Sequence, residues 1–130
     1  MDMAKASVLI VDDDESMLDS FKTLLESAKF HVKTANSAKR ALESVSEEDF
    51  DLFLVDIALP DLNGDELVRQ LKKQDCEASV VLITGFKSFQ ESIDALDLGV
   101  NDILLKPIAP GELIRVAKEA LSSKSKLNCK

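Results

Sequence analysis

The chain has 130 residues, of which 45% are hydrophobic, and its 16 basic and 24 acidic side chains give a net charge of −8. This length corresponds to one ordinary domain that can bury a core. The acidic balance argues against direct contact with nucleic acid or with an anionic membrane surface, because both attract Lys and Arg.

Strand-like and helix-like segments alternate along the chain, which predicts repeated βα units on a parallel sheet. The strand runs are continuously apolar, as is typical of strands that are covered on both faces. The predicted strands are residues 7–11, 31–35, 51–56, 79–84 and 102–105. The predicted helices are residues 15–28, 37–45 and 64–74, a fourth that begins at Ser88 and is stopped by Gly99, and a fifth that begins at Pro110.

The pattern of strands and helices also indicates the domain organisation. No linker or internal repeat is visible, so we expect one domain over residues 5–122 and a polar tail over residues 123–130. No apolar stretch approaches the length that spans a bilayer. Residues 1–5 lead directly into the first strand, and Cys76 and Cys129 form no Cys-x-x-Cys pair, so we expect a cytoplasmic protein with free thiols.

Four of the predicted strands are followed by, or end on, residues that can bind phosphate or a metal ion. The first run leads into Asp12-Asp13-Asp14, and the others lead into Asp56, Thr84-Gly85 and Lys106-Pro107. The carboxyl ends of neighbouring parallel strands lie side by side. We therefore expect these side chains to converge in one crevice, where open α/β sheets bind their ligands.

The three consecutive carboxylates indicate a cation site. An isolated Asp at this position usually only caps the following helix, but three in a row are harder to explain in that way. Like charges about 4 Å apart repel by roughly 4 kcal/mol at an effective dielectric constant of 20. A fold that keeps such a cluster is expected to bind a cation there, and oxygen ligands favour Mg²⁺, with Mn²⁺ as the alternative.

Asp56 is the candidate nucleophile, because a carboxylate opposite an acidic cluster can attack phosphorus and form an aspartyl phosphate. Such a transfer needs in-line positioning and neutralisation of the phosphoryl oxygens. Lys106 can supply a positive charge and Thr84 a hydroxyl, while Gly85 leaves room for the group to approach. Alternatively, Lys106 is a surface lysine before a turn. The sequence leaves the isomer of the Lys106–Pro107 bond open.

These motifs together resemble the receiver domain of two-component response regulators. They are residues 11–15, residues 55–60 with Gly64, residues 83–85, and residues 99–102 leading to Lys106-Pro107. The resemblance covers about residues 5–122. Each motif alone is common, but four in family order and at family-like separations are highly specific.

The resemblance implies a flavodoxin-like (βα)5 fold, a doubly wound parallel sheet with strand order 2-1-3-4-5 in a single domain. It implies that Asp56 is the phosphoacceptor and that Thr84 and Lys106 are the switch hydroxyl and the lysine of the site. The implied ligands of Mg²⁺ are Asp12, Asp13, Asp56 and the backbone carbonyl of Ala58. The Lys106–Pro107 bond is expected to be cis.

The resemblance also implies partners. The phosphoryl donor would be a phosphohistidine on a histidine kinase or a histidine phosphotransfer protein. The chain would be a regulatory domain rather than an enzyme, limited to self-catalysed phosphoryl transfer and slow autodephosphorylation. The surface that changes would be about residues 88–122, where we expect partner docking or a homodimer.

The sequence departs from the family pattern at two places. Ile103 stands where many receivers have an aromatic residue, and the chain has no Tyr. Ala58 and Phe86, which flank the expected phosphoryl group, are apolar and cannot position water for hydrolysis. We therefore expect a long-lived phosphate, the alternative being that both residues only pack.

Three other functions share parts of this residue pattern. A degenerate receiver would act only as a protein-binding module, but all the key side chains are present. A phosphatase of the haloacid dehalogenase class needs a second Asp where Ala58 stands. A nucleotide-binding module needs a glycine-rich phosphate loop, which the four glycines of the chain cannot build.

Overall fold

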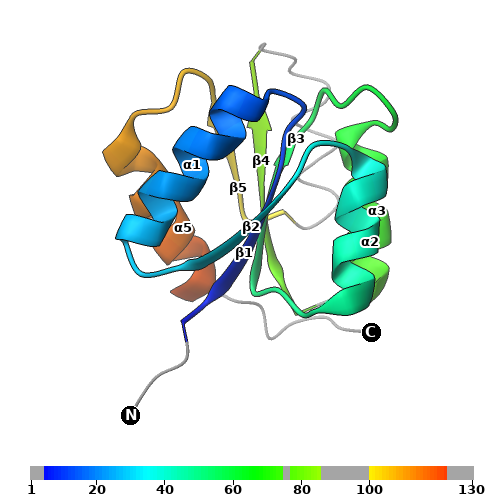
Figure 1. The fold of residues 1–130 in the computed structure, drawn as a ribbon, viewed down its shortest axis with the longest axis horizontal. Coiled ribbons are helices and arrows are strands. Elements are labelled where there is room, and N and C mark those ends of the chain that lie inside the picture. Colours follow the sequence, from blue (N-terminus) through cyan, green and yellow to red (C-terminus); the bar gives the residue numbers. More distant parts are fainter. Residues whose placement is uncertain (1–4, 75–76, 86–99, 123–130) are drawn as a thin grey trace.

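Five parallel strands form the centre of the computed structural model, which describes residues 5–74, 77–85 and 100–122 (Figure 1). The strand order is β2-β1-β3-β4-β5, and each neighbouring pair is parallel. The strands are β1 (Ser7–Val11), β2 (His31–Ala35), β3 (Leu52–Asp56), β4 (Ser79–Thr84) and β5 (Asp102–Leu105). The predicted order of a flavodoxin-like sheet is confirmed.

Helices cover both faces of the sheet. Figure 1 shows α1 (Glu15–Ser27) and α5 (Pro110–Ser122) on one face, and α2 (Ala38–Glu47) and α3 (Gly64–Gln74) on the other. The buried apolar residues accordingly form two clusters, one beneath α1 and α5 and one beneath α2 and α3. The predicted doubly wound architecture is confirmed.

The core explains why the inner strands β1, β3 and β4 are apolar almost without interruption. The edge strand β2 departs from the prediction, because exposed residues, among them His31 and Lys33, alternate along it with buried ones. In β1, Val8 and Ile10 pack beneath α1 and α5, whereas Leu9 and Val11 pack beneath α2 and α3. All four are 0% exposed. Each fully buried side chain of this kind contributes about 1.5–3 kcal/mol relative to its exposed state.

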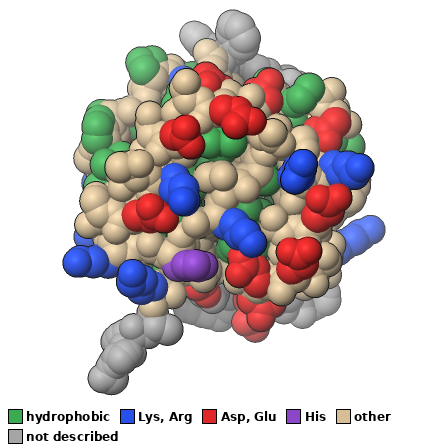
Figure 2. Space-filling view, viewed as in Figure 1, with side chains coloured by type: hydrophobic (Ala, Val, Ile, Leu, Met, Phe, Trp, Pro, Cys, Tyr) green, Lys and Arg blue, Asp and Glu red, His purple; other side chains and the backbone are tan. Residues whose placement is uncertain are grey.

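The charged surface adds little to stability. Acidic and basic side chains are interspersed on the face shown in Figure 2. The ion pair between Lys33 Nζ and Glu48 Oε2 measures 3.4 Å, and both side chains are partly exposed to solvent. Exposed pairs of this kind are worth about 0–1 kcal/mol each, so the folded state depends mainly on the two apolar clusters.

Three element boundaries differ from the predictions by one or two residues. Helix α1 ends at Ser27, because Lys29 adopts a φ of 75° and the N–H of Phe30 bonds the carbonyl of Leu25. Helix α2 begins after Ser37, whose hydroxyl caps it, and continues to Glu47, because two polar residues that apolar periodicity does not mark follow Val45. Strand β3 begins at Leu52 rather than at residue 51.

Some expectations lie outside the described residues. They concern the predicted fourth helix from Ser88 to Gly99, Phe86, the two cysteines and the tail over residues 123–130. Within the described segments, no helix combines the length and the hydropathy that crossing a bilayer requires.

Candidate functional site

The register of the sheet brings the predicted site residues to one edge. Val11 of β1 pairs with Val55 of β3, so the residues that follow them, Asp12 and Asp56, lie next to each other. Thr84 is the last residue of β4, and Lys106 follows β5. This edge is also where the chain order changes direction around β1, which is the usual ligand crevice of an open α/β sheet.

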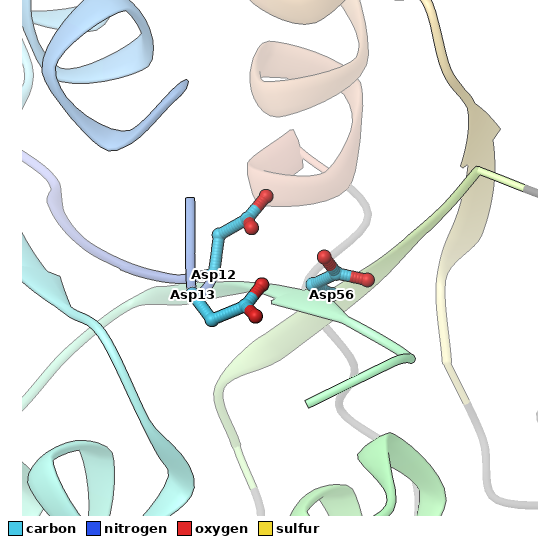
Figure 3. Close-up of side chains that lie close together, drawn as sticks. All are labelled: Asp12, Asp13 and Asp56. Atoms are coloured by element: carbon cyan, nitrogen blue, oxygen red, sulfur yellow. The ribbon is translucent and has the colours of Figure 1, made fainter. Parts of the chain in front are cut away.

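Three carboxylates cluster in this crevice. Asp12 and Asp13 follow β1 and Asp56 ends β3, and Figure 3 shows their side chains close together. One oxygen from each of the three lies within 4.8 Å of the others. Asp12 is 1% exposed and Asp56 is 5% exposed, whereas Asp13 faces solvent. The predicted acidic cluster is therefore assembled, with its outer side open.

Asp14 has a different role from its two neighbours. Its carboxylate accepts hydrogen bonds from the amides of Ser16 and Met17, so it is the N-cap of α1. The amide of Asp14 in turn donates to Oδ1 of Asp12 at 3.0 Å. The N-terminus of α1 thus fixes the orientation of the Asp12 carboxylate.

Lys106 bridges two of the carboxylates. Its Nζ lies 3.0 Å from Oδ2 of Asp12 and 3.2 Å from Oδ2 of Asp56. Its backbone N–H donates to the carbonyl of Thr84 at 2.8 Å, and the Lys106–Pro107 bond is cis, as expected. Burial acts to lower the pKa of Lys106. The hydrogen bonds and negative charges of Asp12 and Asp56 outweigh burial and raise this pKa, so the amine stays charged.

Burial and a neighbouring carboxylate act together on Asp56. Burial raises this pKa above its ordinary value of 3.8, and the charge of Asp12 raises it further. The Ala58 amide, which donates to Oδ1 at 3.0 Å, and the Lys106 ammonium both act to lower it, but burial and Asp12 prevail. One ammonium facing three carboxylates leaves two negative charges, which a divalent cation would neutralise.

The carboxylate cluster fits such a cation. Mg²⁺ takes oxygen ligands at about 2.0–2.1 Å in octahedral geometry, so opposite ligands lie about 4.2 Å apart and adjacent ligands about 2.9 Å apart. Oxygens that are within 4.8 Å of one another would have to approach by no more than about 2 Å to share one ion. The described contacts of Ala58 involve its amide, so its carbonyl remains a predicted ligand.

Backbone contacts hold the two ends of the loop between β3 and α3 close together. The N–H of Gly64 bonds the carbonyl of Ile57 at 3.0 Å, and Ala58 forms an isolated bridge with Asn63. A Cβ at residue 64 would lie 2.5 Å from the Cα of Ile57, so only glycine fits there. This contact fixes the segment that follows Asp56.

Thr84 and Gly85 form the wall next to Lys106. Thr84 is 6% exposed. A Cβ at residue 85 would lie 3.9 Å from Cδ of Lys106, an ordinary contact distance, so this glycine faces the lysine side chain. The site thus gathers Asp12, Asp13, Asp56, Thr84 and Lys106 at one edge of the sheet.

One contact at the site is not foreseen from the sequence. Asp61, in the loop before α3, accepts the amides of Ala38 at 3.0 Å and Lys39 at 3.1 Å. These hydrogen bonds lower the pKa of Asp61. An Asp after Pro60 suggests only a turn, and nothing in the sequence pairs it with a helix that begins 23 residues earlier.

Comparisons with known proteins show which family this chain resembles. The family described as "Response regulator receiver domain" matches residues 8–118. The uncharacterized transcriptional regulatory protein YkoG of Bacillus subtilis (strain 168) is 33% identical over 92% of this chain and 52% of its own length. Response regulator SaeR of Staphylococcus aureus (strain USA300) is 34% identical over 82% of this chain and 46% of its own length. The chain thus spans about half the length of these relatives.

A solved structure resembles the whole fold. The crystal structure of a CheY-like response regulator receiver domain protein from Methanospirillum hungatei JF-1 aligns with a TM-score of 0.90 and 34% identity. The alignment covers 96% of this chain and 100% of that one. The family model, the sequence relatives and the fold all agree with the resemblance that the sequence motifs indicate. This chain belongs to the response regulator receiver domain family.

Proposed function

We propose that Asp56 accepts a phosphoryl group from a phosphohistidine on a partner histidine kinase or histidine phosphotransfer protein. The observation that carries this proposal is the convergence of Asp12, Asp13 and Asp56 within 4.8 Å, with the Lys106 amine 3.2 Å from Asp56. A carboxylate oxygen of Asp56 forms the new bond to phosphorus as the phosphorus–nitrogen bond of the donor breaks. The donor imidazole leaves with the bonding electron pair and takes up a proton.

The surrounding residues would stabilise the transferred group. Lys106 already lies beside Asp56, so its ammonium needs only a small movement to contact a phosphoryl oxygen. The Thr84 hydroxyl, at the end of the neighbouring strand, would donate to another phosphoryl oxygen. Transfer of this kind depends mainly on positioning and on neutralising the oxygens.

Asp12, Asp13, Asp56 and the carbonyl of Ala58 would hold Mg²⁺, or Mn²⁺ in its place. Receiver domains bind Mg²⁺ at an acidic pocket, and the carboxylate cluster of this chain fits that role. When bound, the ion would neutralise the carboxylates and part of the charge on the phosphoryl oxygens.

The proposed domain extends over residues 5–122, with residues 123–130 as a polar tail. We propose that it acts in the cytoplasm as a regulatory domain, limited to its own phosphorylation and slow dephosphorylation. The net charge of −8 argues against direct contact with nucleic acid.

Phosphorylation would shift the domain between two packings. It replaces one negative charge with nearly two beside Lys106 and Thr84. We propose that β5, α5 and the predicted fourth helix form the surface that responds, through partner docking or homodimerisation. In support, Leu105 of β5 is 52% exposed on the edge strand. Beryllofluoride, a phosphoryl mimic, should change amide exchange on this surface, and an unchanged surface would contradict the proposal.

Mass spectrometry after incubation with acetyl phosphate tests the phosphoacceptor role. The chain should gain one phosphoryl group when Mg²⁺ is present, and Asp56→Asn should gain none. Asp19→Asn, which changes an exposed Asp on α1, is the matched control and should be phosphorylated like the wild type. A wild-type chain that gains no mass would favour the degenerate receiver, a protein-binding module without phosphorylation.

A further inference from the structure

Two separate loops supply the proposed ligands of the metal. Asp12 and Asp13 lie in the loop after β1, whereas Asp56 and Ala58 lie where β3 leads into the loop before α3. The geometry of a shared cation site depends on how these two loops are held relative to each other. The turn from β2 into α2, residues 35–39, makes hydrogen bonds to both of them.

The first loop is bonded to one side of this turn. The N–H of Asp12 donates to the carbonyl of Ala35 at 3.1 Å. The side-chain amide of Asn36 donates to Oε2 of Glu15 at 3.0 Å. Glu15 begins α1, directly after the acidic run, so both bonds attach the turn to the segment that carries Asp12 and Asp13.

The second loop is bonded to the other side of the turn by a single side chain. Oδ1 of Asp61 accepts the N–H of Ala38, and Oδ2 accepts the N–H of Lys39. Ser37 already caps the amide of Arg40, so Asp61 satisfies the two further donors of the first turn of α2. A carboxylate is well suited to this helix end, where unpaired N–H groups carry partial positive charge.

We infer that Asp61 is a positioning residue for the divalent cation, because it ties the loop of Ala58 to the turn that also holds Asp12. The base of this loop is fixed by the bond between Gly64 and Ile57, and Asp61 fixes its tip. Without Asp61, the loop would lose its bonds to this turn, and only the contacts at its base would position Ala58 relative to the acidic pair. This inference rests on the proposed binding of Mg²⁺.

The test is Mg²⁺ titration of the wild-type chain and of Asp61→Ala by isothermal calorimetry. The affinity should fall by about tenfold, as is typical when a group that orients metal ligands is removed. Asp61→Asn keeps one acceptor oxygen and should show an intermediate loss. The backbone amide signal of Ala58 in NMR spectra should shift in Asp61→Ala even before Mg²⁺ is added, which a loss of stability alone would not produce.

Asp51→Ala is the matched control. Oδ2 of Asp51 also accepts a backbone amide, that of Ser7 at 2.8 Å, but at the opposite edge of the sheet. Its loss should lower the melting temperature and leave the Mg²⁺ affinity unchanged. If Asp61→Ala does not fold, the Mg²⁺ affinity of Asp61→Asn, measured in the same way, tests the inference.

The outcomes separate this inference from the proposed function. An Asp61 variant that binds Mg²⁺ as tightly as the wild type would overturn the inference and leave the proposed function intact. Equal weakening in Asp51→Ala would also overturn it, because the effect would then reflect stability. A wild-type chain that binds no Mg²⁺ would overturn both.

Discussion

Replacing Gly64 with alanine tests how tightly the loop after Asp56 is packed. The added Cβ would lie 2.5 Å from the Cα of Ile57 and 3.1 Å from the carbonyl oxygen of Asp56, both of them backbone atoms. Carbon atoms in favourable contact are about 3.5–4.0 Å apart, so the two segments would have to separate by about 1 Å. That movement would lengthen the 3.0 Å bond from Gly64 to the carbonyl of Ile57.

Two opposing effects determine how much Gly64→Ala changes the free energy of unfolding. Overpacking typically costs about 1–3 kcal/mol. Replacing a helical glycine with alanine at a compatible position stabilises by about 0.4–1 kcal/mol, chiefly through the unfolded chain. We therefore expect Gly64→Ala to lower the free energy of unfolding by roughly 1–2 kcal/mol.

Gly111 provides the matched control. It lies in the first turn of α5, and a Cβ there would meet no atom within 4 Å. Gly111→Ala should raise the free energy of unfolding by about 0.4–1 kcal/mol. Urea unfolding followed by circular dichroism, without Mg²⁺, measures both variants. A Gly64→Ala chain as stable as the wild type would refute the reasoning, because the loop would then be able to move aside at no cost.

Three further predictions concern the helix end and the acidic site. Lys29→Gly should raise the free energy of unfolding by up to about 1 kcal/mol, because only glycine adopts a φ of 75° without strain; an unchanged urea midpoint would contradict this. In Mg²⁺-free buffer, the wild type should lose stability relative to Asp56→Asn as pH rises from 3.8 through the raised pKa of Asp56, because the folded state binds this proton more tightly than the unfolded chain does. Urea midpoints across that range measure the difference, and a constant difference would show that folding does not raise the pKa of Asp56. Ala58→Asn and Phe86→Glu should shorten the lifetime of the Asp56 phosphate by positioning water, and equal decay rates in wild type and variants would remove this hypothesis.

The sheet and most of the site follow from the sequence for one physical reason. Parallel strands that are covered on both faces need apolar residues throughout, so β1, β3 and β4 are visible as unbroken runs. The polar residue that ends such a run marks the carboxyl edge of the sheet. Asp56 and Lys106 are 50 residues apart, yet the strand pattern alone places them at the same edge.

The parts that sequence reasoning misses depend on contacts between distant segments or on unusual backbone. The role of Asp61 depends on α2 lying beside the loop before α3, which no local pattern encodes. The end of α1 depends on Lys29 adopting a conformation that usually marks glycine. The last two residues of α2, Ser46 and Glu47, are polar, so apolar spacing places its end too early.

Strand β5 places the lysine of the crevice directly beside an outward-facing leucine. Lys106 contacts Asp12 and Asp56, whereas Leu105, one peptide bond earlier, is 52% exposed at the edge of the sheet. A backbone movement at Lys106 would also act on Leu105, because one peptide bond joins the two residues. A change of charge in the crevice is therefore separated from the molecular surface by a single residue step, from Lys106 to Leu105.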